Sequence, residues 1–484
     1  MNYIGERAVV LGAGMAGLLT ARVVSDFYRT VTVVERDRLP DGASQRRGVP
    51  QGRHIHGLLS SGSNVLERFF PGLLDELVAA GATVSDEGDF SRVSLQFGGH
   101  ELVRSGKFGD PASFVFYLPS RPFLEAHVRH RVRAIGNVHI LDGHDVVELF
   151  TEEPQRVAGV RIANRHGGDG AVLHADLVVD AMGRNARTPA FLDSLGYGRP
   201  AESRSVVGVT YASLLLRIPP GTVDEKLVSV GPVPDRPTAG GLFAYENNTW
   251  MITVCGIAGY EPPADRAGMI AFAAELGSAP MVAALNAGEP LSDVSIHRFP
   301  VSAWRRYDKM RRFPSGLLVV GDAICTTNPI YAQGMSVAAL QTAVLHDCLS
   351  RGGEDLSRRF FRAAAKPVGL AWQLTIGADL SLPQVPGRRS AALRVMNWYV
   401  NRILTAAESD IAVAEKFFRV QNLIDSPARL LHPSFMMRVA SAKHRHAGSN
   451  PRLTRPTTCS SAWSPPVTHA PASSSPATKP SGGW

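Results

Sequence analysis

RAVVLGAGMAGLLTARVVSDFYRTVTVVE, residues 7–35, places a strand, a helix and a second strand within a short stretch. Residues 7–11 are apolar enough for a buried strand, and residues 15–28 carry apolar side chains at helical spacing. Residues 31–34 form a second apolar run. A strand, helix and strand in this order begin a doubly wound, Rossmann-like α/β domain.

The turn between the first strand and the helix contains three glycines at a characteristic spacing. Gly12 permits a tight turn, Gly14 lets the backbone approach a pyrophosphate, and Gly17 allows the helix to pack closely on the strand. The phosphates would lie at the positive end of the helix dipole, and Glu35 would accept hydrogen bonds from a ribose diol. The pattern predicts a dinucleotide site, with a tight turn that binds nothing as the alternative. It does not separate FAD from NAD.

A second segment, far along the chain, distinguishes these cofactors. Gly321-Asp322 follows an apolar strand at residues 317–320, and after Pro329 the residues Gly334-Met335 open a helix. This arrangement resembles the Gly-Asp motif of flavoprotein monooxygenases related to p-hydroxybenzoate hydroxylase. The resemblance implies that Asp322 binds the ribityl hydroxyls of FAD, and that the N–H groups of Gly334 and Met335 face the flavin. The alternative is an aspartate that only caps the helix.

Two further matches to this family concern residues 180–187 and Arg121. DAMGRNAR, residues 180–187, resembles the family's Asp-Gly motif, so Asp180 and Gly183 are expected to contact the cofactor. That motif is associated with both FAD and the pyridine nucleotide, which implies NAD(P)H as the electron donor. Ala181 and Ala186 depart from it and put the nicotinamide contact in doubt. Arg121 resembles the arginine that contacts FAD, unless it is an ordinary surface arginine.

A narrower resemblance lies in the loop RRGVPQGRHIH, residues 46–56, and in NPIYAQGMS, residues 328–336. Both are similar to segments of the flavin epoxidases of polyether antibiotic biosynthesis, of the monensin and lasalocid type. An arginine in this loop could neutralise phosphate charge, and which of Arg46, Arg47 and Arg53 does so stays open. The expected cofactor contacts are Arg36, Arg47 and Arg53. His54 and His56 are catalytic candidates as proton donors, or they only shape the loop.

The resemblance implies a flavin-dependent monooxygenase that transfers one oxygen atom from O2, through an FAD C4a-hydroperoxide, to a bulky apolar substrate. Epoxidation and aromatic hydroxylation both stay open, and an FAD-dependent reductase of prenyl double bonds, like geranylgeranyl reductases, is the alternative. A halogenase is disfavoured because its Trp-x-Trp-x-Ile-Pro motif is absent. The remaining hypothesis is a non-enzymatic flavoprotein whose basic tail recruits a partner. Candidate walls of the substrate pocket are Tyr211, Phe243, Tyr245, Trp250 and Phe299.

Composition excludes other classes of function. The formal net charge is +8, but seven Lys and Arg residues follow Asp425 with no further acid, so the rest of the chain is near neutral and a nucleic-acid groove is not expected. The four cysteines are scattered, which indicates neither a disulfide framework nor a metal site. No signal peptide and no run of 18 apolar residues is evident, so we expect a cytoplasmic protein without stable membrane insertion.

Strand and helix patterns predict a discontinuous FAD-binding domain of residues 1–85, 120–190 and 310–360. A substrate domain, antiparallel and rich in strands, is expected from residues 86–119 and 191–309, with a hairpin at residues 246–248. Residues 361–446 are expected to be helical, with Val395 among the buried positions. Residues 447–484 are rich in Ser, Thr and Pro and are expected to be disordered.

Overall fold

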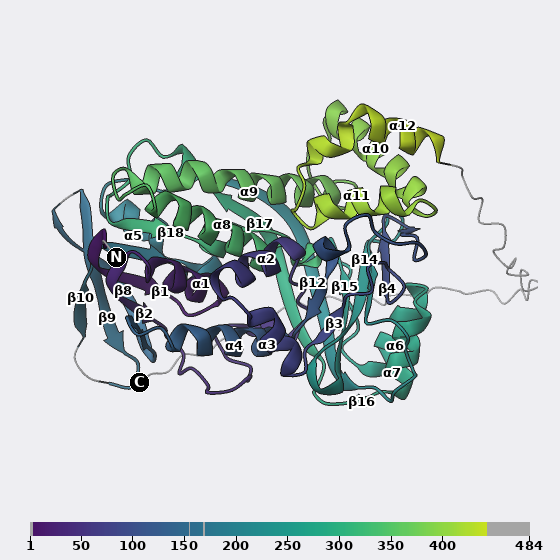
Figure 1. Ribbon diagram of the computed structural model, residues 1–484, viewed down its shortest axis with the longest axis horizontal. Coiled ribbons are helices and arrows are strands. Elements are labelled where there is room, and N and C mark those ends of the chain that lie inside the picture. The colour runs from purple at the N-terminus through teal and green to yellow at the C-terminus, as the bar shows by residue number, and fades with distance from the viewer. Residues whose placement is uncertain (1–2, 154, 168–169, 443–484) are drawn as a thin grey trace, which may run out of the picture. The chain divides into compact units, whose positions relative to one another are not determined.

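The first three elements form the expected strand, helix and strand. The computed structural model describes residues 3–153, 155–167 and 170–442 (Figure 1). Strand β1 (Gly5–Leu11) leads into helix α1 (Met15–Val24), and β2 (Tyr28–Val34) returns parallel to β1, with Leu11 opposite Val34. The helix is shorter than expected, because Tyr28 already pairs with Gly5 as part of the second strand.

Segments far apart in sequence complete a five-stranded parallel sheet. Its order is β18 (Leu317–Val319), β11 (Leu177–Asp180), β1, β2 and β7 (Val138–Leu141), and every neighbouring pair is parallel. Helix α1 packs against α4 (Arg121–Arg133) and α8 (Gly334–Leu349). A small antiparallel sheet of β8 (His144–Glu153), β9 (Arg156–Asn164) and β10 (Ala171–His174) contacts β11 through β9. The α/β, Rossmann-like prediction is confirmed.

A second, larger sheet is built mainly of antiparallel strands. Its order is β19 (Cys325–Thr326), β17 (Ser295–Arg305), β12 (Glu202–Arg217), β15 (Thr249–Gly256), β14 (Thr238–Ala244), β13 (Leu227–Val230), β4 (Val93–Phe97) and β5 (His100–Glu101), and β16 (Glu289–Pro290) pairs with β12. The β13–β4 pair is parallel, so the sheet is mixed. The predicted hairpin is confirmed between β14 and β15, where Asn247 and Asn248 both have φ of 55°.

Two helices pack against the large sheet. They are α6 (Arg266–Glu275) and α7 (Ala279–Ala287), and they enclose an apolar cluster with it. The remaining elements of the first half are α2 (Ser60–Phe69), α3 (Leu73–Ala79), β3 (Thr83–Ser85), β6 (Phe116–Leu118) and α5 (Thr188–Ser194), of which β3 pairs with β6.

The predicted helical region consists of α9 (Leu356–Asp379), α10 (Ala391–Ala407), α11 (Ile411–Gln421) and α12 (Pro433–Ser441). Helix α9 packs on α8, and α10 to α12 bury a second cluster that includes Ile403, Phe417 and Phe418. Val395 was expected to be buried and is 64% exposed, because it lies on the outer side of α10.

Described residues up to 442 belong to one compact unit, and α9 runs across position 360. The division into FAD-binding, substrate and helical domains therefore stays a prediction. The tail expected to be disordered, residues 447–484, lies outside the described residues. Within the described ranges, no helix is long and apolar enough to cross a membrane.

Candidate cofactor and substrate site

The glycine turn has the geometry that a pyrophosphate requires. Gly12 has a φ of 99°, which a residue with a side chain rarely adopts, and a Cβ on Gly17 would lie 1.8 Å from the Gly12 carbonyl oxygen. Around Gly14, in contrast, the nearest atoms to such a Cβ are guanidinium nitrogens of Arg46 and Arg121, at 3.9 Å. No side chain caps the first N–H groups of α1. This helix end is therefore open, flanked by cations and suited to an anion.

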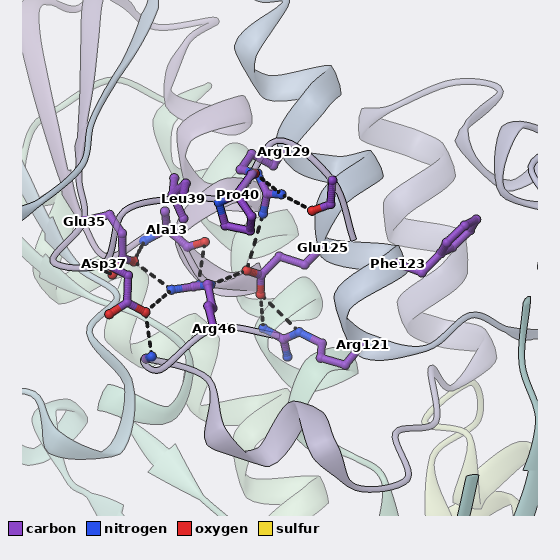
Figure 2. Close-up of polar contacts among 12 residues, drawn as sticks. Ala13, Glu35, Asp37, Leu39, Pro40, Arg46, Arg121, Phe123, Glu125 and Arg129 are labelled. Carbon is purple, nitrogen blue, oxygen red and sulfur yellow. Dashed lines mark hydrogen bonds and ion pairs between the residues drawn. The ribbon is translucent and has the colours of Figure 1, made fainter. Parts of the chain in front are cut away.

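Glu35 is held at the end of β2 by a buried network, which Figure 2 shows. One carboxylate oxygen accepts a hydrogen bond from the Ala13 N–H at 2.7 Å, and the other accepts one from Asp37 N–H at 3.0 Å. Arg46 NH1 lies 3.4 Å from the Glu35 carboxylate and 3.3 Å from that of Asp37. Arg46 also donates to the Ala13 carbonyl at 3.1 Å. The glycine turn, Glu35 and the loop that follows are thus tied together by one arginine.

The same arginine reaches helix α4. Arg46 Nε donates to Glu125 Oε1 at 2.6 Å, and Arg121 NH2 donates to Glu125 Oε2 at 2.8 Å. Burial alone would raise the pKa of Glu125, but Arg121 and Arg46 outweigh burial and lower that pKa. Arg121 is 7% exposed, so it is not an ordinary surface arginine. The network fixes its guanidinium beside the glycine turn.

Asp322 and the start of α8 form the second part of the site. The Asp322 side chain makes no hydrogen bond or ion pair to any described residue, and its carboxylate oxygen lies 3.9 Å from where a Cβ on Gly334 would be. Burial raises the pKa of Asp322, which nearby Arg121, Arg184 and Arg305 counteract. Gly321 has a φ of 67° and packs against Ala16 of α1. An unpaired carboxylate beside an uncapped helix start fits the polyol chain and the ring of a flavin.

A buried aspartate of α9 fixes the loop that leads into α8 through hydrogen bonds. Asp379 accepts hydrogen bonds from the Asn328 amide at 2.8 Å and the Tyr331 hydroxyl at 2.9 Å. Burial raises the pKa of Asp379 to about 6, although both hydrogen bonds oppose this rise. Pro329, at the start of the same loop, lines the cavity described below. Asp379 thereby positions the segment that carries Pro329 and Gly334.

Asp180 does not reach the cavity, contrary to the sequence-based expectation. Its buried carboxylate accepts hydrogen bonds from the Thr188 hydroxyl and from the Met182 N–H, the latter at 2.8 Å. These bonds hold the 180–188 turn closed, so Asp180 shapes the turn. Gly183, which has a φ of 74°, and Arg184 line the cavity in its place.

The arginines of the loops after β2 differ in position. Arg36 and Arg47 are exposed side chains that line the cavity, and their contact with a cofactor stays a prediction. Arg53, the last residue of the short helical turn at Pro50–Arg53, is exposed and is not among the residues that line the cavity. The sequence did not decide whether Arg46 contacts the phosphates. In the structure, Arg46 belongs to the buried network that joins the glycine turn, Glu35 and α4.

One cavity of about 1970 Å³ joins these features. This volume exceeds the roughly 300–1,000 Å³ of a pocket for one drug-sized ligand, so it has room for a dinucleotide and a second molecule. Six arginines line it together with three carboxylates, which are those of Glu35, Asp145 and Asp322. Away from the glycine turn the wall becomes apolar, with Phe97, Leu227, Phe243, Val400, Ile403 and Phe417 contributed by the large sheet and by α10 and α11.

The expected pocket walls are confirmed in part. Tyr211, Phe243 and Phe299 line the cavity, whereas Tyr245 and Trp250 line a separate hollow of about 290 Å³. The prediction is wrong for Tyr245 and Trp250. The Tyr245 hydroxyl is nevertheless close to the site, because it accepts a hydrogen bond from the His56 N–H at 3.0 Å.

His54 ends a chain of hydroxyl groups on the large sheet. Its Nδ1 lies 2.8 Å from Ser213 Oγ, which lies 2.6 Å from Thr253 Oγ1, and Thr253 accepts from the Ile55 N–H at 3.1 Å. We assign Thr253 as donor to Ser213 and Ser213 as donor to His54, because every hydroxyl hydrogen then has an acceptor. Nε2 of His54 consequently carries its hydrogen, and His54 lines the cavity.

Both histidines of the loop are neutral near pH 7. Burial, with His297 and Arg53 nearby, lowers the pKa of His54 to about 4. Burial and the neighbouring Arg121 lower the pKa of His56 to about 3, while a hydrogen bond from its ring to the His54 carbonyl opposes this shift. A protonated imidazolium acid is therefore not expected at either position. A neutral N–H donor at His54 is consistent with the geometry.

Sequence reasoning missed several residues that build the site. Asp37, Glu125 and Arg129 complete the network around Arg46, and α10 and α11 supply part of the apolar wall. One signal for the first group was present: residues 121, 125 and 129 place charges of alternating sign at helical spacing on α4. No local pattern links α10 to the glycine turn.

Comparisons with known proteins agree with this geometry. Residues 7–189 match the family model described as FAD dependent oxidoreductase. The chain is 38% identical to Protein Rv3254 of Mycobacterium tuberculosis. The match extends over 435 residues and covers 87% of this chain and 90% of that protein. It is also 26% identical to kynurenine 3-monooxygenase of Salinispora arenicola, over 76% of this chain and 78% of that protein.

Among solved structures, p-nitrophenol 4-monooxygenase PnpA of Pseudomonas putida has the same fold. The TM-score is 0.61 at 17% identity, and the match covers 88% of this chain and 99% of PnpA. The chain therefore belongs to the same family as Protein Rv3254, and its N-terminal part carries an FAD-dependent oxidoreductase domain.

Proposed function

We propose that the chain is an FAD-dependent monooxygenase that takes electrons from NAD(P)H and transfers one oxygen atom of O2 to a bulky apolar substrate. The product would be an epoxide of an alkene or a phenol of an aromatic ring, formed in secondary metabolism. The observation that carries this proposal is the single cavity, which runs from the open glycine turn past Asp322 to an apolar wall. A cofactor and an apolar substrate would meet inside it.

FAD, when bound, would supply the redox chemistry with O2, so the protein has to bind, orient and exclude water. Gly14 and the start of α1 would hold the pyrophosphate, Glu35 the ribose and Asp322 the ribityl chain. The start of α8 at Gly334 would place N–H groups against negative charge on the ring. The apolar wall would orient the substrate and keep water away from the reacting atoms.

The donor of electrons is proposed on the charge of the cavity. Arg184 and Arg187 line it on the side of the 180–188 turn, where they could contact a phosphorylated nucleotide that arrives and leaves. One relative named above, kynurenine 3-monooxygenase of Salinispora arenicola, is a monooxygenase by name, and the loops at residues 46–56 and 328–336 resemble those of polyether epoxidases. These resemblances support oxygen transfer and secondary metabolism.

The test uses the purified full-length protein, whose visible spectrum should first show bound flavin. Long linear polyenes and polycyclic phenols are then supplied with NADH or NADPH under labelled molecular oxygen. We expect at least one class to accelerate nicotinamide oxidation and to gain one labelled atom per product molecule. A label acquired only from water would refute the monooxygenase.

The same apolar wall would also suit a reductase of prenyl double bonds. That function requires no O2, so a polyprenyl substrate should be reduced under strict anaerobic conditions. Saturated product without O2, and no oxygenated product with it, would replace the first proposal with this one.

A further inference from the structure

Half of the strongly exposed large apolar side chains in the described part of the chain lie in its last helical elements. Six of the twelve such residues with the greatest exposure lie on α10, on the short helical turn at Pro427–Leu431 or on α12: Val395, Met396, Trp398, Leu431, Met436 and Met437. Trp398 is 64% exposed and Met437 is 66% exposed. We call these six residues the C-terminal patch.

The elements that carry the patch are packed together, as Figure 1 shows for α10 and α12. The Tyr399 hydroxyl of α10 donates to the Leu430 carbonyl at 2.6 Å and so ties α10 to the turn before α12. Met396 and Leu431 are exposed and also line the large cavity. The patch therefore continues into the mouth of the cavity on its apolar side.

The described elements that carry the patch are also basic. Residues 388–442, the described part of the chain that carries the patch, contain eight Lys and Arg against four Asp and Glu, a net charge of +4. Two of these basic residues, Arg419 and Arg438, form ion pairs with Asp425 and Asp410 at 2.8 and 2.7 Å, and the net positive charge remains. Exposed Trp and Met side chains among arginines are the composition of a helix that lies on an anionic lipid surface.

We propose that the C-terminal patch docks this protein on an anionic membrane surface and opens the cavity toward the lipid. The positive charge disfavours a second copy of the chain as the occupant, because two such faces would repel each other, and it favours an anionic surface. Trp398 and Met437 enter the interfacial region. The apolar substrate of the proposed function, on which this step rests, passes from the lipid along Met396 and Leu431 into the cavity. The protein lies on the membrane and does not span it.

Binding of the full-length protein to lipid vesicles tests this proposal. Vesicles of phosphatidylcholine alone are compared with vesicles that also contain phosphatidylglycerol, and the bound fraction is measured by flotation. The test variant is Trp398→Ser/Met437→Ser, because neither residue lines the cavity. The matched control is Val206→Ser/Ile296→Ser, which removes two exposed apolar side chains from the large sheet.

We expect binding to the anionic vesicles only, weakened at about 1 M salt, where charges are screened beyond roughly 3 Å. The vesicle affinity of the test variant should fall at least about tenfold, because two interfacial side chains are lost. The control variant should bind like the wild type. No binding by the wild type, or equal binding by both variants, would overturn the proposal. Self-association that Trp398→Ser/Met437→Ser abolishes, without vesicle binding, would assign the patch to a second copy. Flotation measures vesicle binding and does not depend on turnover. A negative flotation result would therefore refute membrane docking only, and the proposed function would still be tested by oxygen incorporation.

Discussion

Replacement of Arg46 by methionine should be among the most damaging single changes at the nucleotide end of the cavity. Arg46 is 7% exposed, and the carboxylates of Glu35, Asp37 and Glu125 around it are 6%, 8% and 5% exposed. Glu125 keeps Arg121 at 2.8 Å, but Glu35 and Asp37 lose their buried cation. Removing one partner of a buried ion pair costs about 3–5 kcal/mol, because a charge is left uncompensated. We expect a loss of that size in the free energy of unfolding.

The measurement compares urea unfolding of the FAD-free wild type with that of Arg46→Met. Arg131→Met is the matched control, because Arg131 forms a partly exposed pair with Glu76 at 3.0 Å, with side chains 31% and 33% exposed. Such pairs contribute about 0–1 kcal/mol. Arg46→Lys adds a graded case, since an ammonium keeps the charge but cannot reach three carboxylates and the Ala13 carbonyl together. It should retain part of the stability.

FAD affinity provides a second measurement on the same variants. Arg46→Lys should bind FAD more weakly than the wild type, because Glu35 and the glycine turn are no longer held by one guanidinium. If Arg46→Met unfolds within about 1 kcal/mol of the wild type, or if Arg46→Lys binds FAD normally, the network does not organise the site and our reasoning is wrong.

Substitutions elsewhere in the site should separate FAD binding from stability and from protonation. Gly14→Ala should fold with nearly unchanged stability, because a Cβ there meets nothing closer than 3.9 Å, and it should nevertheless lose FAD. Gly17→Ala should be strongly destabilised, because its Cβ would lie 1.8 Å from the Gly12 carbonyl oxygen. Flavin content and thermal unfolding distinguish the two variants. Asp322→Ala should lose FAD while Asp322→Asn retains part of it, and full flavin in purified Asp322→Ala would contradict the assigned ribityl contact. His54, with a pKa of about 4, should stay neutral from pH 6 to 9, so wild type and His54→Gln should show pH profiles of kcat/KM with the same shape in that range, and a limb lost only in His54→Gln would show that its charge matters. Asp379 has its pKa raised from 3.8 to about 6, so the folded state favours the proton and its contribution to stability falls by about 3 kcal/mol as pH rises from 4 to above 6. Asp379→Asn should therefore gain stability relative to the wild type over that pH range, and a difference in melting temperature that is independent of pH would contradict the shift.

The parts of the site that the sequence predicted are those whose geometry is local. Gly12, Gly14 and Gly17 lie in one turn, and β2 returns Glu35 to that turn whatever the rest of the chain does. Arg46 could not be separated from Arg47 and Arg53 in this way. The three residues share one loop, and the difference between them is the position of Glu125, which belongs to α4.

Asp180 shows why a motif alone does not assign a carboxylate. In sequence it occupies a similar place to Asp322, because each aspartate lies at or just beyond the carboxyl end of a strand of the parallel sheet. Thr188, eight residues later, takes the Asp180 carboxylate as its hydrogen-bond acceptor, whereas no described side chain takes that of Asp322. The role of each aspartate depends on whether a local donor satisfies it first. An unpaired carboxylate that lines a cavity is available to a ligand, and this property, which only the folded chain reveals, makes Asp322 the stronger of the two candidates.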